Sequence, residues 1–155
     1  MEIGIRKYAD YDYDSFKEML GVCFSQDYNI PLTGSQREGL CKDIVQSVEA
    51  DITFLDFLIL GGKAIGFISY QIDSPKSDWC EKEGYGCIRE MFISVDQRGK
   101  GYGRGLAIHA ESELQKLSAP YIYLTTDGNK DFWTKIGYRD TGEICIKNDG
   151  SIFIK

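Results

Sequence analysis

The sequence has little of what metal sites and disulfide scaffolds require. It contains five cysteines, none of them in a C-x-x-C pair, and a single histidine, His109. Zinc sites are built mainly from clustered Cys and His, and an odd number of scattered thiols does not form a disulfide framework. We therefore expect no metal cofactor, and we expect His109 to be a solvated or packed side chain rather than a catalytic one.

Long apolar runs are missing as well. No segment approaches the ~20 consecutive apolar residues that a membrane-spanning helix needs. The first six residues, MEIGIR, lack the layout of a signal peptide. The sequence therefore predicts a cytoplasmic protein with no membrane partner.

Basic residues are fewer than acidic residues, 18 against 24. The formal net charge is -6, which argues against nucleic acid as a partner because the protein would repel phosphate backbones. The excess of acidic residues lies in residues 1–85, whereas acidic and basic residues nearly balance in residues 86–155. The second half of the chain can therefore accept an anion.

The length of 155 residues fits one domain spanning residues 1–155, large enough to hold a core without disulfides. Hydrophobic periodicity predicts a mixed α/β pattern. Ile3 to Ile5 predict a short strand with one buried face, followed by a helix capped by Asp12 or Asp14 and by a second helix that begins at Ser35. The other expected elements are strands at 52–60, 64–72, 87–95, 121–125 and 138–141, helices near 106–117 and 129–135, and a final hairpin of 144–147 with 151–154.

A glycine-rich segment, QRGKGYGRG, lies between the strand at 87–95 and the helix that follows. Closely spaced glycines expose backbone N–H groups, and the positive end of the helix dipole points at the same place, so the loop can cradle a phosphate. A tight strand-to-helix turn is the alternative. The Walker pattern G-x-x-x-x-G-K-[ST] is absent, and a dinucleotide G-x-G-x-x-G loop does not fit the glycine positions.

Two motifs carry a resemblance to a known family. R-x-x-G-x-G is present as Arg98, Gly101 and Gly103, preceded by a strand containing Met91-Phe92-Ile93, and FWTKIGY follows at 132–138. Together with the order of elements, they make the chain resemble the GCN5-related N-acetyltransferase (GNAT) family. The resemblance implies a single GNAT-like α/β (mixed α+β) domain, with a central, mostly antiparallel twisted sheet of about seven strands flanked by about four helices.

The resemblance also implies acetyl-coenzyme A as co-substrate, with direct transfer of the acetyl group to a primary amine on a small molecule or peptide. It assigns the pyrophosphate to the loop amides and the pantetheine arm to the backbone of Met91 and Ile93. Asn129 is expected either to bond this arm or only to cap a helix. The loop residues so implicated are Arg98, Gly99, Lys100, Gly101, Tyr102, Gly103 and Arg104.

The catalytic groups are less well defined by the sequence. Glu90, on the coenzyme-binding strand, is the candidate base for the amine, with an ion pair or plain solvent exposure as the alternative. Many relatives place a general-acid tyrosine in the aromatic segment, where this chain has Trp133. The acid therefore stays unassigned, with Tyr138, Tyr123, Tyr102 or solvent as substitutes.

Other interpretations remain open at this point. Three tyrosines and three aspartates near the N-terminus either line an acceptor pocket or form a solvated helix entrance: Tyr11, Tyr13, Tyr28, Asp10, Asp12 and Asp14. The main alternative function is a non-catalytic acyl-coenzyme A binding or sensing domain, and a second is an interaction module in which the glycine loop is only a turn. The sequence leaves a homodimer open.

Overall fold

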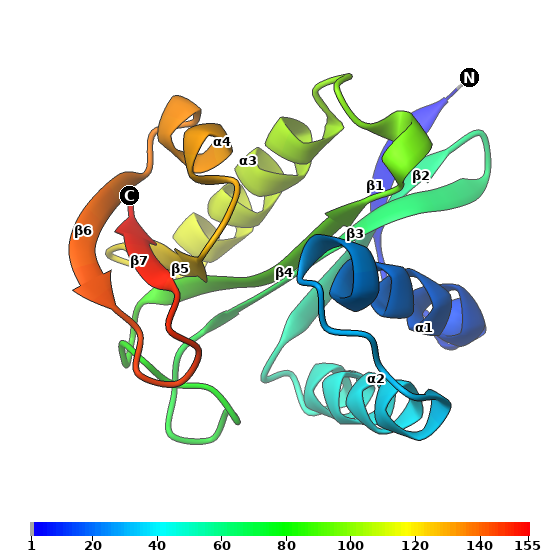
Figure 1. Ribbon diagram of the computed structural model, residues 1–155, viewed down its shortest axis with the longest axis horizontal. Helices are drawn as coiled ribbons and strands as arrows, with labels where there is room; N and C mark the ends of the chain where they lie inside the picture. The colour runs from blue at the N-terminus through cyan, green and yellow to red at the C-terminus, as the bar shows by residue number, and fades with distance from the viewer. Residues whose placement is uncertain (1) are drawn as a thin grey trace.

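The computed structural model describes residues 2–155 and shows one seven-stranded sheet with the strand order β1-β2-β3-β4-β5-β7-β6. The expected fold class is confirmed, with four α-helices around a mostly antiparallel sheet (Figure 1). The strands are β1 (Ile3–Lys7), β2 (Phe54–Leu60), β3 (Lys63–Ile72), β4 (Gly86–Ile93), β5 (Ile122–Thr126), β6 (Arg139–Ile144) and β7 (Ser151–Ile154). The α-helices are α1 (Tyr13–Val22), α2 (Gly34–Glu49), α3 (Tyr102–Lys116) and α4 (Lys130–Lys135).

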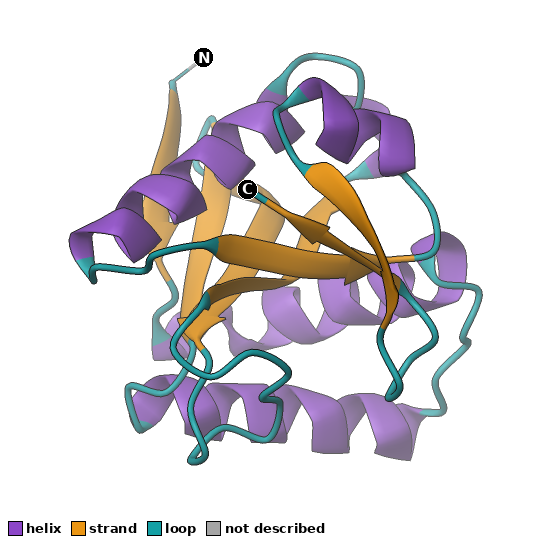
Figure 2. Ribbon diagram, turned by 90° about the vertical axis from the view of Figure 1, so that its left-hand side faces the viewer, coloured by secondary structure: helices purple, strands orange, loops and turns teal. Residues whose placement is uncertain are grey.

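Helices cover both faces of the sheet (Figure 2). On one face, α1 and α2 bury an aromatic cluster that includes Phe16, Phe57 and Phe67. On the other, α3 and α4 pack on a cluster that includes Ile68, Leu106 and Trp133. Because alternate residues of a strand point to opposite faces, β2 and β3 contribute to both clusters. No helix among residues 2–155 is long and apolar enough to cross a bilayer.

The central strands β4 and β5 run parallel but pair at two positions only, Gly86 with Ile122 and Cys87 with Tyr123. Beyond these pairs the two strands separate. β5 then pairs with β7, and β4 stays paired with β3. The sheet is therefore open between β4 and β5 along most of β4, which leaves one edge of that strand without a partner strand.

Several local expectations differ from the structure. The second helix begins after Thr33, whose hydroxyl accepts from the amide of Gln36, so Ser35 is not the cap. Asp12 precedes α1 but its side chain makes no capping bond to that helix, because its carboxylate accepts from Arg6 at 2.7 and 2.8 Å and from the amide of Ala9 at 2.8 Å. The strand β1 is an exposed edge strand rather than one with a buried face.

The short strand expected at 138–141 corresponds to β6, which is longer and spans Arg139–Ile144. β6 has an irregularity at Gly142, where φ is 79°, and pairs with β7 on either side of it. The strand expected at 144–147 does not form beyond Ile144. The turn that follows spans 145–150, because Cys145 and Gly150 close it with a 2.8 Å backbone bond. The expected final hairpin exists, but its first strand ends before the predicted one.

Gly66 in β3 permits the close approach of β4 and generates a stability prediction. A β-carbon there would lie 2.5 Å from the backbone oxygen of Phe92, which cannot shift without disturbing the sheet. Gly66→Ala should lower the free energy of unfolding by about 1–3 kcal/mol, the usual range for overpacking. Gly4→Ala is the matched control, since Gly4 is also in a strand but has no atom within 4 Å of the added carbon. Urea denaturation of both variants measures the effect, and equal stability would contradict it.

Candidate functional site

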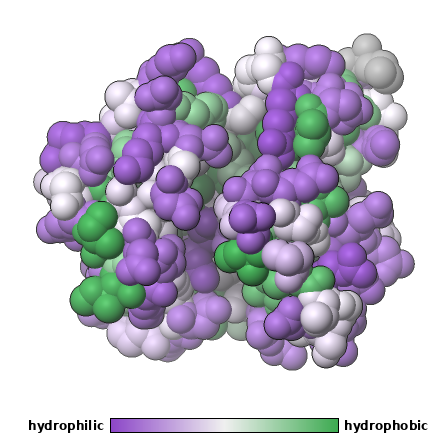
Figure 3. Space-filling view, in the orientation of Figure 1, coloured by the Kyte–Doolittle hydropathy of each residue, from purple (hydrophilic) through white to green (hydrophobic). Residues whose placement is uncertain are grey.

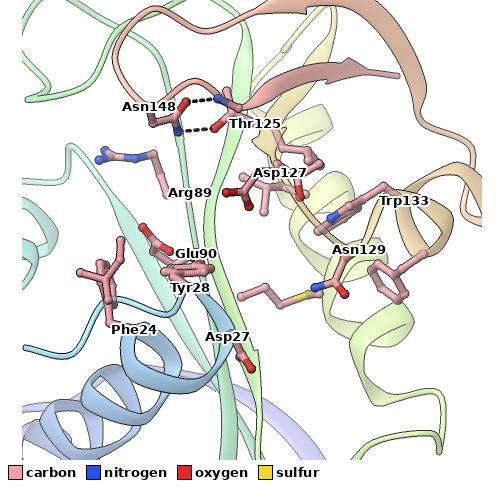
Figure 4. A pocket seen from close by; sticks show the side chains of 17 residues that line it. Phe24, Asp27, Tyr28, Arg89, Glu90, Thr125, Asp127, Asn129, Trp133 and Asn148 are labelled. Carbon is pink, nitrogen blue, oxygen red and sulfur yellow. Dashed lines mark hydrogen bonds between the residues drawn. The ribbon is translucent and has the colours of Figure 1, made fainter.

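The opening between β4 and β5 forms a cleft with a volume of about 320 Å³. In the space-filling view a groove runs between the part built from α4, β6 and β7 and the part built from α1 and α2 (Figure 3). The labelled residues that line the cleft are Phe24, Asp27, Tyr28, Arg89, Glu90, Thr125, Asp127, Asn129, Trp133 and Asn148 (Figure 4). The cleft therefore combines aromatic walls with several carboxylates.

The glycine loop joins the end of β4 to the start of α3. Gly99 and Gly101 have φ angles of 77° and 87°, in the left-handed region that glycine adopts without strain. Within residues 2–155, the backbone amides of residues 99–104 have no hydrogen-bond acceptor, and the space next to Gly99 and Gly101 is open. These unpaired amides at a helix N-terminus form an anion cradle.

The charged side chains of this loop have different surroundings. Arg98 donates from Nε to the carbonyl oxygen of Ile93 at 2.8 Å and forms an ion pair of 2.9 Å with Asp27. Its guanidinium therefore ties the loop to the segment after α1 instead of standing free. Lys100 is exposed and contacts only the Gln97 side chain, and Arg104 is exposed on the first turn of α3.

The open edge of β4 offers backbone groups to a ligand. The amide of Glu90 donates to Ser69 Oγ and that of Ser94 to the carbonyl of Ile65, so both point toward β3. Alternation along the strand turns the backbone groups of Met91 and Ile93 to the open side. The Ile93 carbonyl is occupied by Arg98, while the Met91 side chain lies in the cleft wall near Gly103.

A bulge in β4 sets the direction of the two charged residues at the centre of the cleft. Ser69 pairs with Glu90 but Tyr70 pairs with Ile88, so Arg89 is the extra residue. Arg89 donates to Gln71 at 2.8 Å, pairs with Asp78 at 3.2 Å and lies over the Trp79 ring. The Arg89 guanidinium is thereby held against the loop at 73–85.

Glu90 is hydrogen-bonded to Tyr28, whose hydroxyl donates to Oε2 of the carboxylate (Figure 4). Burial raises the pKa of Glu90 above its ordinary value, while the bond from Tyr28 and the charge of Arg89 offset part of this rise. Burial and the adjacent carboxylate also raise the pKa of Tyr28, so this hydroxyl stays protonated at neutral pH. The cleft therefore contains a carboxylate that is hydrogen-bonded to a protonated tyrosine hydroxyl.

Trp133 and Asn129 line the opposite wall. Trp133 is buried between Phe132 and Tyr138, and its indole nitrogen is directed toward the cleft (Figure 4). Asn129 precedes α4 in a left-handed conformation and makes no capping bond with its side chain. Asn129 therefore occupies the expected N-cap position without a side-chain capping bond, and its side-chain amide lies in the cleft wall with no hydrogen-bond partner among residues 2–155.

The tyrosines proposed as substitutes for the missing acid do not line this cleft. Tyr138 donates to Glu111 at 2.9 Å and Tyr123 donates to Asp73, and both rings are buried. Tyr102 packs on the α3 side of the core. Tyr28 is the tyrosine that lines the cleft among residues 2–155.

The N-terminal acidic and aromatic set does not assemble as one pocket. Tyr13 donates to Glu38, Asp12 pairs with Arg6, and Tyr11 is 78% exposed. Only Tyr28 of that set reaches the cleft, because the irregular turn at Cys23–Asp27 carries the chain past β4. His109 is packed against Tyr70 and contacts Asp56 at 2.7 Å, far from the cleft wall.

Sequence reasoning missed several cleft residues. Neither periodicity nor a motif marked four of them: Asp27 at the end of the helical turn Cys23–Asp27, Arg89 in a strand bulge, and Asp127 and Asn148 in loops. The sequence offered no signal for Asp27, whose partner Arg98 lies 71 positions further along the chain. Within residues 2–155 no group of three or more His, Cys, Asp or Glu side chains is arranged to hold a metal ion.

Comparison with known proteins agrees with this geometry. The sequence model of the acetyltransferase (GNAT) family matches residues 13–138. No curated protein sequence matches the chain significantly. The match spans more than half of the chain, so the chain belongs to the GNAT family of acetyltransferases.

Solved structures with the same fold have low sequence identity to this chain. The PaiA N-acetyltransferase from Thermoplasma acidophilum in complex with coenzyme A has a TM-score of 0.76 at 18% identity, covering 100% of this chain and 99% of its own. A GNAT acetyltransferase from Brucella melitensis in complex with acetyl-CoA has a TM-score of 0.68 at 14% identity, and the match covers 99% of this chain and 87% of the Brucella chain. AAC(6')-Iy with a CoA-S-monomethyl-acetylneamine bisubstrate analog has a TM-score of 0.74 at 13% identity, and the match covers 94% of this chain and 96% of the AAC(6')-Iy chain.

The bond between Tyr28 and Glu90 generates a prediction about proton affinity. Because the Tyr28 hydroxyl stabilises the ionised carboxylate, Tyr28→Phe should raise the pKa of Glu90 further above its ordinary value. Side-chain carboxyl NMR titration, with Glu90→Gln used to assign the signal, measures the shift. Tyr11→Phe, which changes an exposed hydroxyl, serves as the control. A lower or unchanged pKa in Tyr28→Phe would contradict the pairing.

Proposed function

We propose that this protein transfers an acetyl group from acetyl-coenzyme A to a primary amine by direct attack. The observation that carries the proposal is the cleft between β4 and β5, which has a hydrogen-bonded carboxylate at its centre. The anion cradle lies next to this cleft, because Gly103 of the loop is close to Met91 and Phe132 of the cleft wall. Coenzyme A or acetyl-CoA is present in two neighbours of the same fold, and a third holds the bisubstrate analog CoA-S-monomethyl-acetylneamine. A small molecule or peptide amine is the proposed acceptor.

The loop supplies most of the coenzyme site in this proposal. The amides of Gly99, Lys100, Gly101, Tyr102, Gly103 and Arg104 are the proposed ligands of the pyrophosphate. The side chains of Lys100 and Arg104 add positive charge, and Arg98 acts by holding the loop in place. The pantetheine arm would add to the open edge of β4 at Met91 and Ile93, with the free amide of Asn129 facing it.

Glu90 is the proposed base. An alkylamine with an ordinary pKa of about 10.4 arrives protonated at neutral pH and must lose a proton before it can attack. Burial that raises the pKa of Glu90 makes this carboxylate a stronger base than an exposed one, and Tyr28 holds it in position. Glu90 takes this first proton directly or through water. The amine nitrogen then forms a bond to the acetyl carbon, the C–S bond breaks with release of the thiolate, and the second proton of the nitrogen passes to solvent.

The departing thiolate needs no protein acid in this scheme. An indole N–H cannot protonate it, so Trp133 acts as a wall of the cleft. The Tyr28 hydroxyl is held by Glu90 and has a raised pKa, which makes it a poor proton donor. A thiol with an ordinary pKa of about 8.5 leaves readily near neutral pH and takes its proton from solvent.

Gly101 allows a direct test of the coenzyme site. Its φ of 87° excludes a β-branched side chain, and the amides around it must approach the phosphates closely. Gly101→Val should weaken coenzyme A binding by more than tenfold, as measured by calorimetry. Gly105→Ala, in the same segment but with ordinary helical geometry and open space, should bind normally. Unchanged affinity in Gly101→Val, at an intact melting temperature, would refute the proposed site.

Glu90→Gln tests the base. Turnover at neutral pH should fall by roughly 10² or more at nearly unchanged coenzyme affinity, and the loss should shrink at high pH where the amine is already neutral. Burial opposes the ionised form of Glu90 in the folded protein, so neutral Gln should not lower the melting temperature. An acceptor screen that follows free thiol provides the assay. An equal loss at every pH would assign Glu90 a structural role, and no thiol release with any amine would favour a binding domain without catalysis.

A further inference from the structure

A second cavity, with a volume of about 470 Å³, lies on the α3 side of the sheet. Its walls come from the outer strands β1 and β2, from Tyr70 of β3 and from the C-terminal half of α3. It shares no lining residue with the cleft between β4 and β5. Cavities of this size hold small organic ligands in other proteins.

A buried carboxylate forms the polar part of this cavity. Asp56 is 4% exposed, and its Oδ2 accepts from the Tyr70 hydroxyl at 2.6 Å and contacts His109 Nε2 at 2.7 Å. Its second oxygen, Oδ1, has no hydrogen-bond partner among residues 2–155. Oδ1 is not fully enclosed, because Arg37 Nε is the buried side-chain N or O atom that lacks a partner among residues 2–155. Oδ1 therefore opens onto the cavity, where it can accept a hydrogen bond from a ligand.

The other charged groups around the cavity leave one cation free. Arg6 is engaged by Asp12, and Glu113 is paired with Lys116 at 3.3 Å. Lys7 is exposed and has no ion-pair partner among the described residues. It is the cross-strand neighbour of Asp56, so both side chains lie on the same face of the sheet. The cavity therefore presents one buried negative and one exposed positive group side by side.

The remaining walls are apolar. Phe54 packs its ring 5.4 Å from that of Tyr70, while Ile5 and Leu117 flank the cavity and are 36% and 50% exposed. Exposed aliphatic side chains beside a cavity gain free energy when a ligand covers them. Asp56 could link β2 to His109 of α3 without an adjacent cavity or exposed apolar side chains. The cavity and its apolar walls are therefore not explained by that link.

We propose that this cavity binds a small zwitterion, a free α-amino acid with an aliphatic side chain. Its ammonium group donates to Oδ1 of Asp56, its carboxylate pairs with Lys7, and its side chain packs on Ile5, Phe54 and Leu117. A zwitterion matches both charges of the cavity at once, whereas a ligand with a single charge matches only one of them. This site is separate from the acetyl-transfer cleft, and the proposal does not depend on that reaction.

L-leucine is the probe, compared with isopentylamine and 4-methylpentanoate, which each keep one of its charges. Calorimetry and backbone amide NMR on the full chain should show leucine binding, with each analog at least tenfold weaker. The chemical shift changes should map to β1, Asp56 and the second half of α3. No leucine binding, or analogs as tight as leucine, would overturn the proposal.

Two variants complete the experiment. Lys7→Gln and Asp56→Asn should each weaken leucine binding at least tenfold, whereas Lys63→Gln, an exposed lysine outside the cavity, should have no effect. Lys7→Gln changes an exposed side chain, so it tests the site even where Asp56→Asn perturbs folding. Equal affinity in wild type and Lys7→Gln would refute the zwitterion site. Shift changes confined to the cleft around Glu90 would mean that leucine binds there as an amine, and would also refute it.

Discussion

The separation of β4 and β5 is the constraint on which the rest of this structure depends. Two parallel strands that pair at only two positions leave the edge of β4 open in the middle of a sheet, where unpaired backbone groups are normally costly. β7 and β6 continue the sheet from β5 and do not return to β4. Glu111 of α3 strengthens this arrangement by accepting from both Tyr138 and Lys155.

Electrostatics inside the cleft follow from what each carboxylate contacts. Asp27 is neutralised by Arg98 and fastens the glycine loop, whereas Glu90 faces a neutral tyrosine and lies in a desolvated position. Burial raises the pKa of Glu90, and the hydrogen bond from Tyr28 offsets only part of this rise. One acidic residue thereby serves structure and the other is suited to accept a proton.

Much of the fold could be read from the sequence. Apolar periodicity located the helices and most strands, and the glycine pattern after 87–95 located the phosphate-type loop that the structure shows with unpaired amides. Boundaries near turns were less accurate. The cap at Thr33 and the bounds of β6 depend on which of several neighbouring residues forms the hydrogen bond. Residue type alone does not decide between these neighbours.

The sequence by itself determined the class of the protein, because local spacing specifies both the strand-loop-helix unit with its glycines and the later aromatic segment. Only the tertiary structure decided what surrounds Glu90. Its partner Tyr28 is 62 positions away in the chain and reaches it through an irregular turn after α1. The second cavity likewise needs Lys7, Asp56 and His109 from three separate elements. Such contacts arise from the packing of distant segments, and no local pattern encodes them.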